Sequence, residues 1–118
     1  MKTLHIWLIV GVLGLLVACA PAMEVRPHKW ALAVQTAETR EAHEALAKHY
    51  EEVAKQMDDD AQEEREMLAR YEADPHKYGK RILDLKAHAQ AMIRDFELAA
   101  KESKQMAEYH WQMAKEAK

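Results

Sequence analysis

The chain has 118 residues, of which 31% are charged, and its formal net charge is -3 at pH 7. Acidic and basic residues are mixed along the chain, so no basic stripe indicates a nucleic-acid partner. The single cysteine, Cys19, excludes an internal disulfide and a multi-cysteine metal site. Glycine and proline are scarce while Ala, Glu, Lys, Met and Leu dominate, a composition typical of long helices or coiled coils. We therefore expect an all-α protein.

Residues 1–18 have the layout of a secretory signal peptide. They contain a basic start at Lys2, an apolar stretch from Leu4 to Val17, and small residues before Cys19. About 15 residues are continuously apolar, which is shorter than the roughly 20 that a transmembrane helix needs. We therefore expect this segment to be removed rather than to span the membrane.

The tetrapeptide Leu16-Val17-Ala18-Cys19, which ends this segment, resembles the lipobox of bacterial lipoprotein precursors. The resemblance implies cleavage before Cys19, a diacylglyceryl thioether on its sulfur and a third acyl chain on its freed amine. Together these chains anchor a protein stably to a membrane. In Gram-negative lipoproteins an aspartate after the cysteine usually retains the protein at the inner membrane, whereas this chain has Ala20. The resemblance therefore implies an outer-membrane lipoprotein that faces the periplasm.

Two breaks organise the chain after Cys19. Residues 19–29 contain two prolines and are expected to form a tether, and residues 74–80 contain the third proline and a glycine and are expected to form a turn. We expect one helix over 30–73 and a second over 81–117. Because the break between them is short, the two helices should pack as a long antiparallel αα-hairpin.

The second helix shows a heptad pattern, in which apolar or small residues recur at alternating spacings of three and four along one face. These seam positions are Ile82, Leu85, Ala89, Met92, Phe96, Ala99, Ser103, Met106, His110, Met113 and Ala117. A weaker match in the first helix consists of Leu46, Tyr50, Val53, Met57, Met67 and Tyr71. Facing residues of an antiparallel hairpin should have numbers that sum to about 154. This register places Met57 near Phe96 and His43 near His110.

Three apolar residues of the second helix, Leu83, Ile93 and Leu98, lie off this seam and form a second apolar face. A two-helix rod would leave that face in water, although burying apolar surface stabilises a protein by roughly 25 cal/mol per Å². We therefore expect the hairpin to dimerise into a four-helix bundle, and an unidentified envelope protein is a further expected partner.

One candidate ligand site combines Met106, His110 and Met113, which share a helical face, with His43 on the opposite helix. Thioether and imidazole groups suit copper(I), so copper is the cofactor that this set favours. The alternative is that the methionines fill an irregular alanine-rich seam and that His110 marks a polar position in it. The sequence contains no Glu-x-x-His, His-Glu-x-x-His or Cys-x-x-Cys-His motif, so the stronger metal and haem signatures are absent.

The sequence gives little support for an enzyme, because Ser103 is the only serine and no phosphate-binding loop or nucleophile elbow is present. The leading interpretation is a lipid-anchored helical interaction or scaffold protein of the cell envelope. One alternative is a helical bundle that binds a small ligand or copper(I). Another is a murein-associated structural protein, because Lys118 at the end of the chain resembles the terminal lysine of the murein lipoprotein of enteric bacteria. A hairpin, however, returns Lys118 toward the membrane end.

Overall fold

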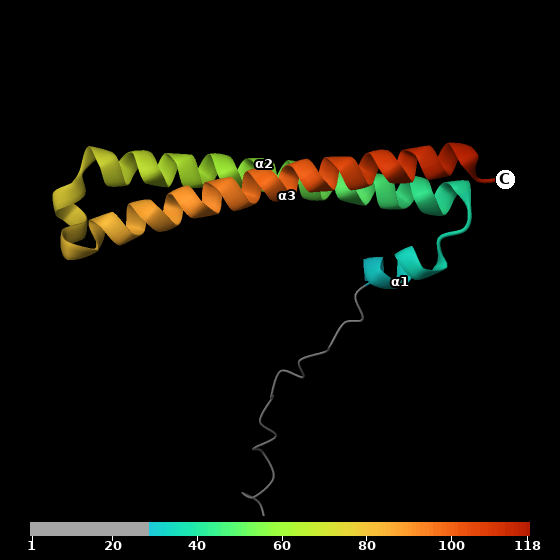
Figure 1. Ribbon diagram of the computed structural model, residues 1–118, viewed down its shortest axis with the longest axis horizontal. Helices are drawn as coiled ribbons and strands as arrows, with labels where there is room; N and C mark the ends of the chain where they lie inside the picture. The colour runs from blue at the N-terminus through green and yellow to red at the C-terminus, as the bar shows by residue number, and fades with distance from the viewer. Residues whose placement is uncertain (1–28) are drawn as a thin grey trace, which may run out of the picture.

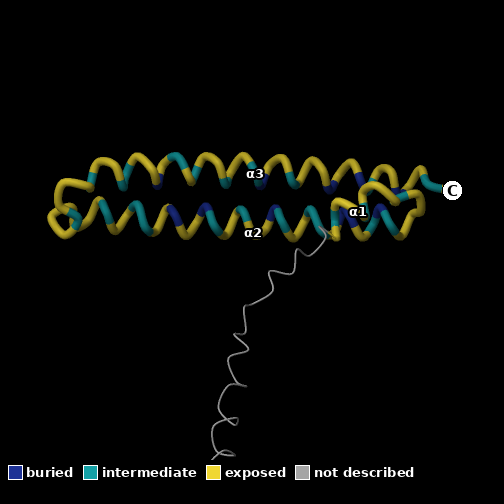
Figure 2. The backbone as a smooth tube through the Cα atoms, turned by 90° about the horizontal axis from the view of Figure 1, so that it is seen from below, coloured by how far each residue is buried: buried dark blue, intermediate teal, exposed yellow. Residues whose placement is uncertain are grey.

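The computed structural model describes residues 29–118, and this part of the chain contains helices and no strands (Figure 1). Its elements are α1 (Lys29–Thr36), α2 (Arg40–Ala73), the 3-10 segment η1 (Pro75–Arg81) and α3 (Ile82–Glu116). Helices α2 and α3 lie side by side and antiparallel, which confirms the expected all-α hairpin (Figure 1, Figure 2). The expected signal peptide, Cys19 and the tether up to residue 28 lie outside the described residues. Among the helices described, none combines the length and apolarity needed to cross a bilayer.

The helix expected over residues 30–73 is two helices, α1 and α2, with a break at residues 37–39. Thr39 is the N-cap of α2. Its backbone is extended (φ -106°, ψ 161°), and its hydroxyl accepts a hydrogen bond from the Ala42 N–H at 3.1 Å. Such an N-cap satisfies a backbone donor that the first turn of a helix leaves free. The break lets α1 turn back and pack beside α2 (Figure 1).

The η1 turn joins α2 to α3 at the end of the hairpin farthest from α1. Asp74 ends α2 by donating its N–H to the Arg70 carbonyl, and Pro75 then occupies the first position of η1. Gly79 has φ 58° and ψ -138°, a conformation that glycine adopts without the steric cost of a side chain. The rings of Tyr71 and Tyr78 meet edge to face with centroids 4.9 Å apart, which packs the turn against α2.

The seam between α2 and α3 consists mainly of alanine. On each helix three buried alanines recur every seven residues, and they face the other helix along the hairpin (Figure 2). These two rows are Ala47, Ala54 and Ala61 on α2, and Ala100, Ala107 and Ala114 on α3. Leu46 is the only large side chain in the described residues that is fully buried. The small methyl groups therefore allow the two backbones to approach closely while burying little apolar surface per residue.

The seam has the expected heptad period, but one of its two rows on α3 is displaced by one residue. Ala89 and His110 are buried, as expected. Met106 and Met113, expected in the seam, are 38% and 45% exposed, and Ala99 is only half-buried. The next residue in the chain is buried in each case, which gives the row Ala100, Ala107 and Ala114. A methionine in so narrow a gap would overpack it, so the longer side chains lie beside the seam.

The second apolar face expected on α3 is also only partly correct. Leu83 and Leu98 are exposed. Ile93, in contrast, is half-buried, because it falls seven residues before Ala100 and so belongs to the same row. Of the three residues expected to form this face, only Leu83 and Leu98 are therefore exposed to water, while Ile93 contributes to the seam.

One long edge of the hairpin is polar, and its side chains form one hydrogen bond and two ion pairs across the two helices. From the open end, where α2 begins and α3 ends, toward η1, the pairs are Glu51 with Trp111, Asp58 with Lys104, and Arg65 with Glu97. The indole N–H of Trp111 donates to Glu51 at 2.7 Å, and the ammonium of Lys104 donates to Asp58 at 2.7 Å. Exposed ion pairs of this kind contribute about 0 to 1 kcal/mol each. We refer to this side as the polar edge.

Candidate functional site at the open end and the methionine edge

Two buried histidines meet in the seam at the open end of the hairpin. The Nδ1 atoms of His43 and His110 lie 3.2 Å apart, and the two side chains are 7% and 6% exposed. Their rings stack at 26° with centroids 5.5 Å apart. The contact confirms the antiparallel register expected from the sequence, in which these two residues face each other.

Aromatic rings extend from this histidine pair to α1. Tyr50 stacks on His110 with centroids 5.6 Å apart and an angle of 8°, and it also contacts His49 at 5.4 Å. His49 in turn stacks on Trp30 of α1, with centroids 4.0 Å apart and planes inclined by 13°. A continuous series of ring contacts therefore links all three α-helices at the open end, through Trp30, His49, Tyr50, His110 and His43.

The surroundings of His110 favour its uncharged form. Burial lowers the pKa of His110 below its ordinary value of 6.5, and the positive charge that His43 carries when protonated lowers it further. With both rings neutral, one Nδ1 carries a hydrogen and donates it while the other Nδ1 accepts it. At least one imidazole lone pair is thus directed into the seam.

The four candidate ligands expected from the sequence fall into two groups. His43 and His110 are buried together, whereas Met106 and Met113 lie on the exposed flank of α3, one turn before and one turn after His110. Within residues 29–118, no three or more His, Cys, Asp or Glu side chains come together as a metal-binding group. Cys19, the expected lipidation site, lies outside the described residues. Copper binding at these four residues remains a prediction.

The edge opposite the polar edge carries an uncovered apolar row. The polar-edge residues come one position after a seam residue, as Trp111 follows His110, whereas the row Met92, Ala99, Met106 and Met113 comes one position before the seam alanines. These two positions lie on opposite sides of the seam. The three methionines are 38% to 45% exposed. On α2 the corresponding row contains the half-buried Val53 and Met67 with the half-buried Asp60 between them, and we call the two rows together the methionine edge.

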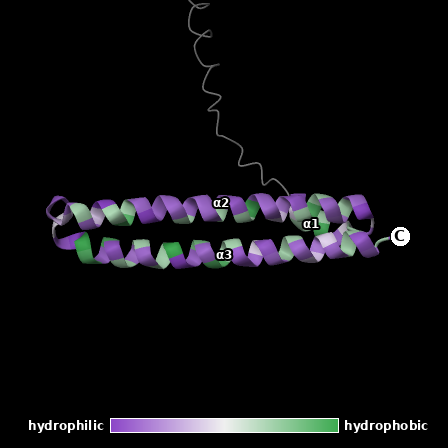
Figure 3. Ribbon diagram, turned by 90° about the horizontal axis from the view of Figure 1, so that it is seen from above, coloured by the Kyte–Doolittle hydropathy of each residue, from purple (hydrophilic) through white to green (hydrophobic). Residues whose placement is uncertain are grey.

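Helix α1 lies beside this edge at the open end. His49, on which Trp30 stacks, is three residues after Leu46 and four before Val53, so it neighbours the α2 row of the methionine edge. Leu32 and Val34 of α1 are 56% and 49% exposed and add to the apolar surface there. Most of the hairpin surface is hydrophilic, which distinguishes these residues from their surroundings (Figure 3).

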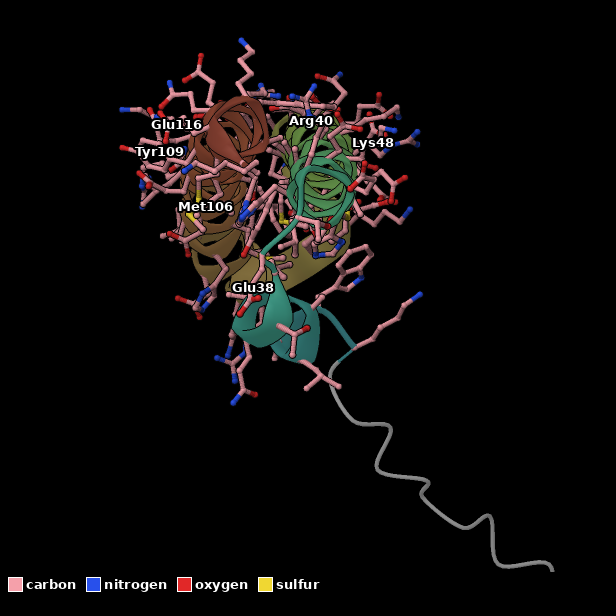
Figure 4. All side chains as sticks on the ribbon, turned by 90° about the vertical axis from the view of Figure 1, so that its right-hand side faces the viewer. Glu38, Arg40, Lys48, Met106, Tyr109 and Glu116 are labelled. Carbon is pink, nitrogen blue, oxygen red and sulfur yellow. The ribbon has the colours of Figure 1, made fainter. Side chains whose placement is uncertain are left out.

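Acidic side chains border the methionine edge. On α3, Asp95 and Glu102 lie within one turn of the methionine row and are exposed, and Glu63 occupies the corresponding border on α2. Among the described residues, none of these three carboxylates forms an ion pair. Met106, Tyr109 and Glu116 lie on the same flank of α3 (Figure 4). This edge therefore combines exposed thioethers with unpaired negative charge, unlike the polar edge.

An open depression of about 520 Å³ lies on the polar edge, lined in part by Glu51, Lys104 and Trp111. Those three side chains already hydrogen-bond within the hairpin. The depression lies on the polar edge and so is separate from the methionine edge. Because these polar groups already have hydrogen-bond partners, they offer few free donors or acceptors to a ligand.

The aromatic contacts of Trp30, His49 and Tyr50 at the open end were not predicted from the sequence. Trp30 had no periodic context, and the cap that separates α1 from α2 rests on Thr39 alone. The Thr39 hydroxyl, followed by the acidic Glu41, was a usable signal for a helix start. The alanines at 47, 54 and 61 also show a seven-residue period that could have indicated the seam of α2.

No family model, curated protein or solved structure matches the chain.

Proposed function

We propose that this protein is a lipid-anchored helical interaction module of the bacterial cell envelope, and that its methionine edge binds an amphipathic helix with basic flanks. The observation that carries the proposal is the row Met92, Ala99, Met106 and Met113, in which the three methionines are exposed and Ala99 is half-buried, with unpaired carboxylates beside it. The row has the period of a coiled-coil seam, which suits a helical partner.

The anchor rests on the sequence of residues 1–19. A short apolar segment that ends in Leu16-Val17-Ala18-Cys19 supports acylation of Cys19, removal of the preceding residues and attachment to the outer membrane on its periplasmic side. The tether that follows would connect the lipid to α1. Because α1 lies at the open end, that end of the hairpin is the one nearer to the membrane.

The charge of the partner follows from the border of the methionine edge. Asp95, Glu102 and Glu63 are exposed without an ion-pair partner in the described part of the chain, so lysines or arginines beside an apolar stripe would complement them. A second copy joined edge to edge would instead bring carboxylates of the same kind toward one another. Charge complementarity therefore favours a basic helix over the homodimer expected from the sequence.

The anchor is tested by labelling cells with a palmitate analogue and fractionating their membranes. The natural chain should carry the label and sediment with the outer membrane, whereas Cys19→Ser should lose both properties. If Cys19→Ser kept its mature size and its membrane attachment, the anchoring part of the proposal would be wrong.

The binding surface is tested with two designed three-heptad helices that have the same apolar stripe, one flanked by lysines and the other by glutamates. Fluorescence anisotropy with the acyl-free chain should show binding of the lysine peptide, weakened by salt, and little binding of the glutamate peptide. The double variant Asp95→Lys/Glu102→Lys should reverse this preference. Glu108→Lys, a matched charge reversal at an exposed position that lines the depression on the polar edge, should leave it unchanged.

Sedimentation of the same acyl-free chain tests whether a second copy of the chain, rather than a basic helix, covers the methionine edge. A monomer that binds one lysine peptide supports the proposal. A stable dimer that excludes both peptides, and that Met106→Asp dissociates, would show that a second copy covers the methionine edge. Equal binding of both peptides would show that the acidic border does not select the partner.

A further inference from the structure

The buried histidine pair has chemistry that the interaction surface does not use. In a seam built of alanine, two imidazoles at His43 and His110 cost more to bury than two apolar side chains of similar size. The hydrogen bond between their Nδ1 atoms offsets only part of that cost. Among the described residues, Glu64 is the only other polar side chain buried in the seam. The pair therefore calls for a chemical explanation beyond packing.

A shift of one hydrogen converts the pair into a two-nitrogen ligand. When the Nδ1 hydrogen of one ring moves to its Nε2, both Nδ1 lone pairs point into the space between the rings, and the net charge of the pair does not change. The two nitrogens lie 3.2 Å apart. An ion bound linearly at about 2.0 Å from each nitrogen needs them roughly 4 Å apart. The rings would thus separate by less than ~1 Å at the open end.

The surroundings restrict the ion that such a pair can hold. Zinc requires about four protein or water ligands and calcium requires six or more oxygens, yet no third His, Cys, Asp or Glu joins the pair within residues 29–118. A single positive charge is also less costly to bury than two. Copper(I) accepts two neutral donors and favours thioethers as additional ligands. Met106 and Met113 provide thioethers one turn on either side of His110, at the exposed edge of the seam.

We propose that His43 and His110 form a copper(I) site in which the two Nδ1 atoms bind the ion, with Met106 and Met113 forming the route by which it reaches them. The two nitrogen ligands lie in the seam and not at the methionine edge. Met106 and Met113 belong to both, so a partner helix bound at that edge would cover the route but not the nitrogen ligands. The lipid anchor takes no part in the site. It narrows the four-ligand set expected from the sequence to two buried nitrogen ligands and two exposed thioethers. Binding replaces the hydrogen bond between the rings with two metal–nitrogen bonds and joins α2 to α3 at the open end.

The test uses the full chain in detergent with Cys19→Ser, which removes the one thiol that would compete for copper. Copper(I) is titrated without oxygen against a coloured chelator. One equivalent should bind, and zinc should not displace it. Silver(I), a diamagnetic substitute with similar ligand preferences, should shift the imidazole NMR signals of His43 and His110 and leave those of His76 unchanged. X-ray absorption should show two nitrogen neighbours.

The double variant His43→Leu/His110→Leu keeps the side-chain volume in the seam, so it should remain helical and lose the copper. His76→Ala, in the distal turn, is the matched control and should bind as the parent does. Met106→Leu/Met113→Leu should slow copper uptake more than it weakens binding. No uptake by the parent, one equivalent retained by the double leucine variant, or equal affinity for zinc would each overturn the proposal.

Discussion

Trp30 of α1 stacks on His49 of α2 with ring centroids 4.0 Å apart and planes inclined by 13°. No side chain of α1 is fully buried, so this stack is the main described contact that holds α1 against the hairpin. A short helix held by one aromatic contact should open far more easily than the alanine seam.

We expect Trp30→Ala to release α1 and to leave the hairpin folded. Backbone amides of residues 29–36 should then exchange with solvent at nearly the rate of an unfolded peptide, while amides near Ala54 and Ala107 keep their protection. Hydrogen exchange followed by mass spectrometry measures this difference. Trp111→Phe, which removes the hydrogen bond to Glu51 on the polar edge, is the control and should leave α1 protected.

Stability should decrease as the pH falls below about 6.5, because burial and His43 lower the pKa of His110 in the folded chain. Below the unfolded value the unfolded state binds a proton that the folded state does not, so acid favours unfolding until the lowered folded pKa is reached. Above pH 7 this contribution is constant. Urea unfolding of the natural chain, measured between pH 5 and 8, should show that the free energy of unfolding decreases with falling pH. A slope of the same size in His110→Leu would assign it to other groups.

The position of the seam predicts that the neighbouring residues Ala99 and Ala100 differ in how much a larger side chain destabilises the hairpin. Ala100→Leu should destabilise the hairpin by about 1 to 3 kcal/mol, because the larger side chain overpacks a buried position between two close backbones. Ala99→Leu should cost less than that or be neutral, because Ala99 is only half-buried at the methionine edge. Urea denaturation followed by circular dichroism compares them. Equal costs would argue against the displaced row described above.

The hairpin register also predicts a specific crosslink. In the Cys19→Ser background, Met57→Cys and Phe96→Cys should form a disulfide within one chain, because both positions face each other in the register that brings His43 to His110. Cysteines at Met57 and Leu83 should not crosslink, since Leu83 lies 13 residues before Phe96 on α3, which is more than three helical turns from the residue that faces Met57. Mass spectrometry of the oxidised chain distinguishes them. Crosslinks formed only between chains would indicate a domain swap.

Much of the fold was predictable because one short break and one sustained period leave few arrangements. Long helices follow from the scarcity of glycine and proline, and the break near Pro75 and Gly79 allows the chain to reverse only once in the hairpin. An antiparallel register then pairs His43 with His110 without any knowledge of side-chain packing. Local composition and periodicity, which act over short stretches of chain, are sufficient for these features.

Packing between the helices decided what periodicity could not. The rows that contain Ala99 and Ala100 have the same seven-residue period and differ by one position, so both are acceptable seams in the sequence alone. Only the close approach of α2 selects the row of small residues and leaves Met106 and Met113 in water. The same is true of α1, because its place beside His49 depends on a contact with Trp30 that spans a helix break. Tertiary contacts between distant residues determine which face of each helix remains free to bind.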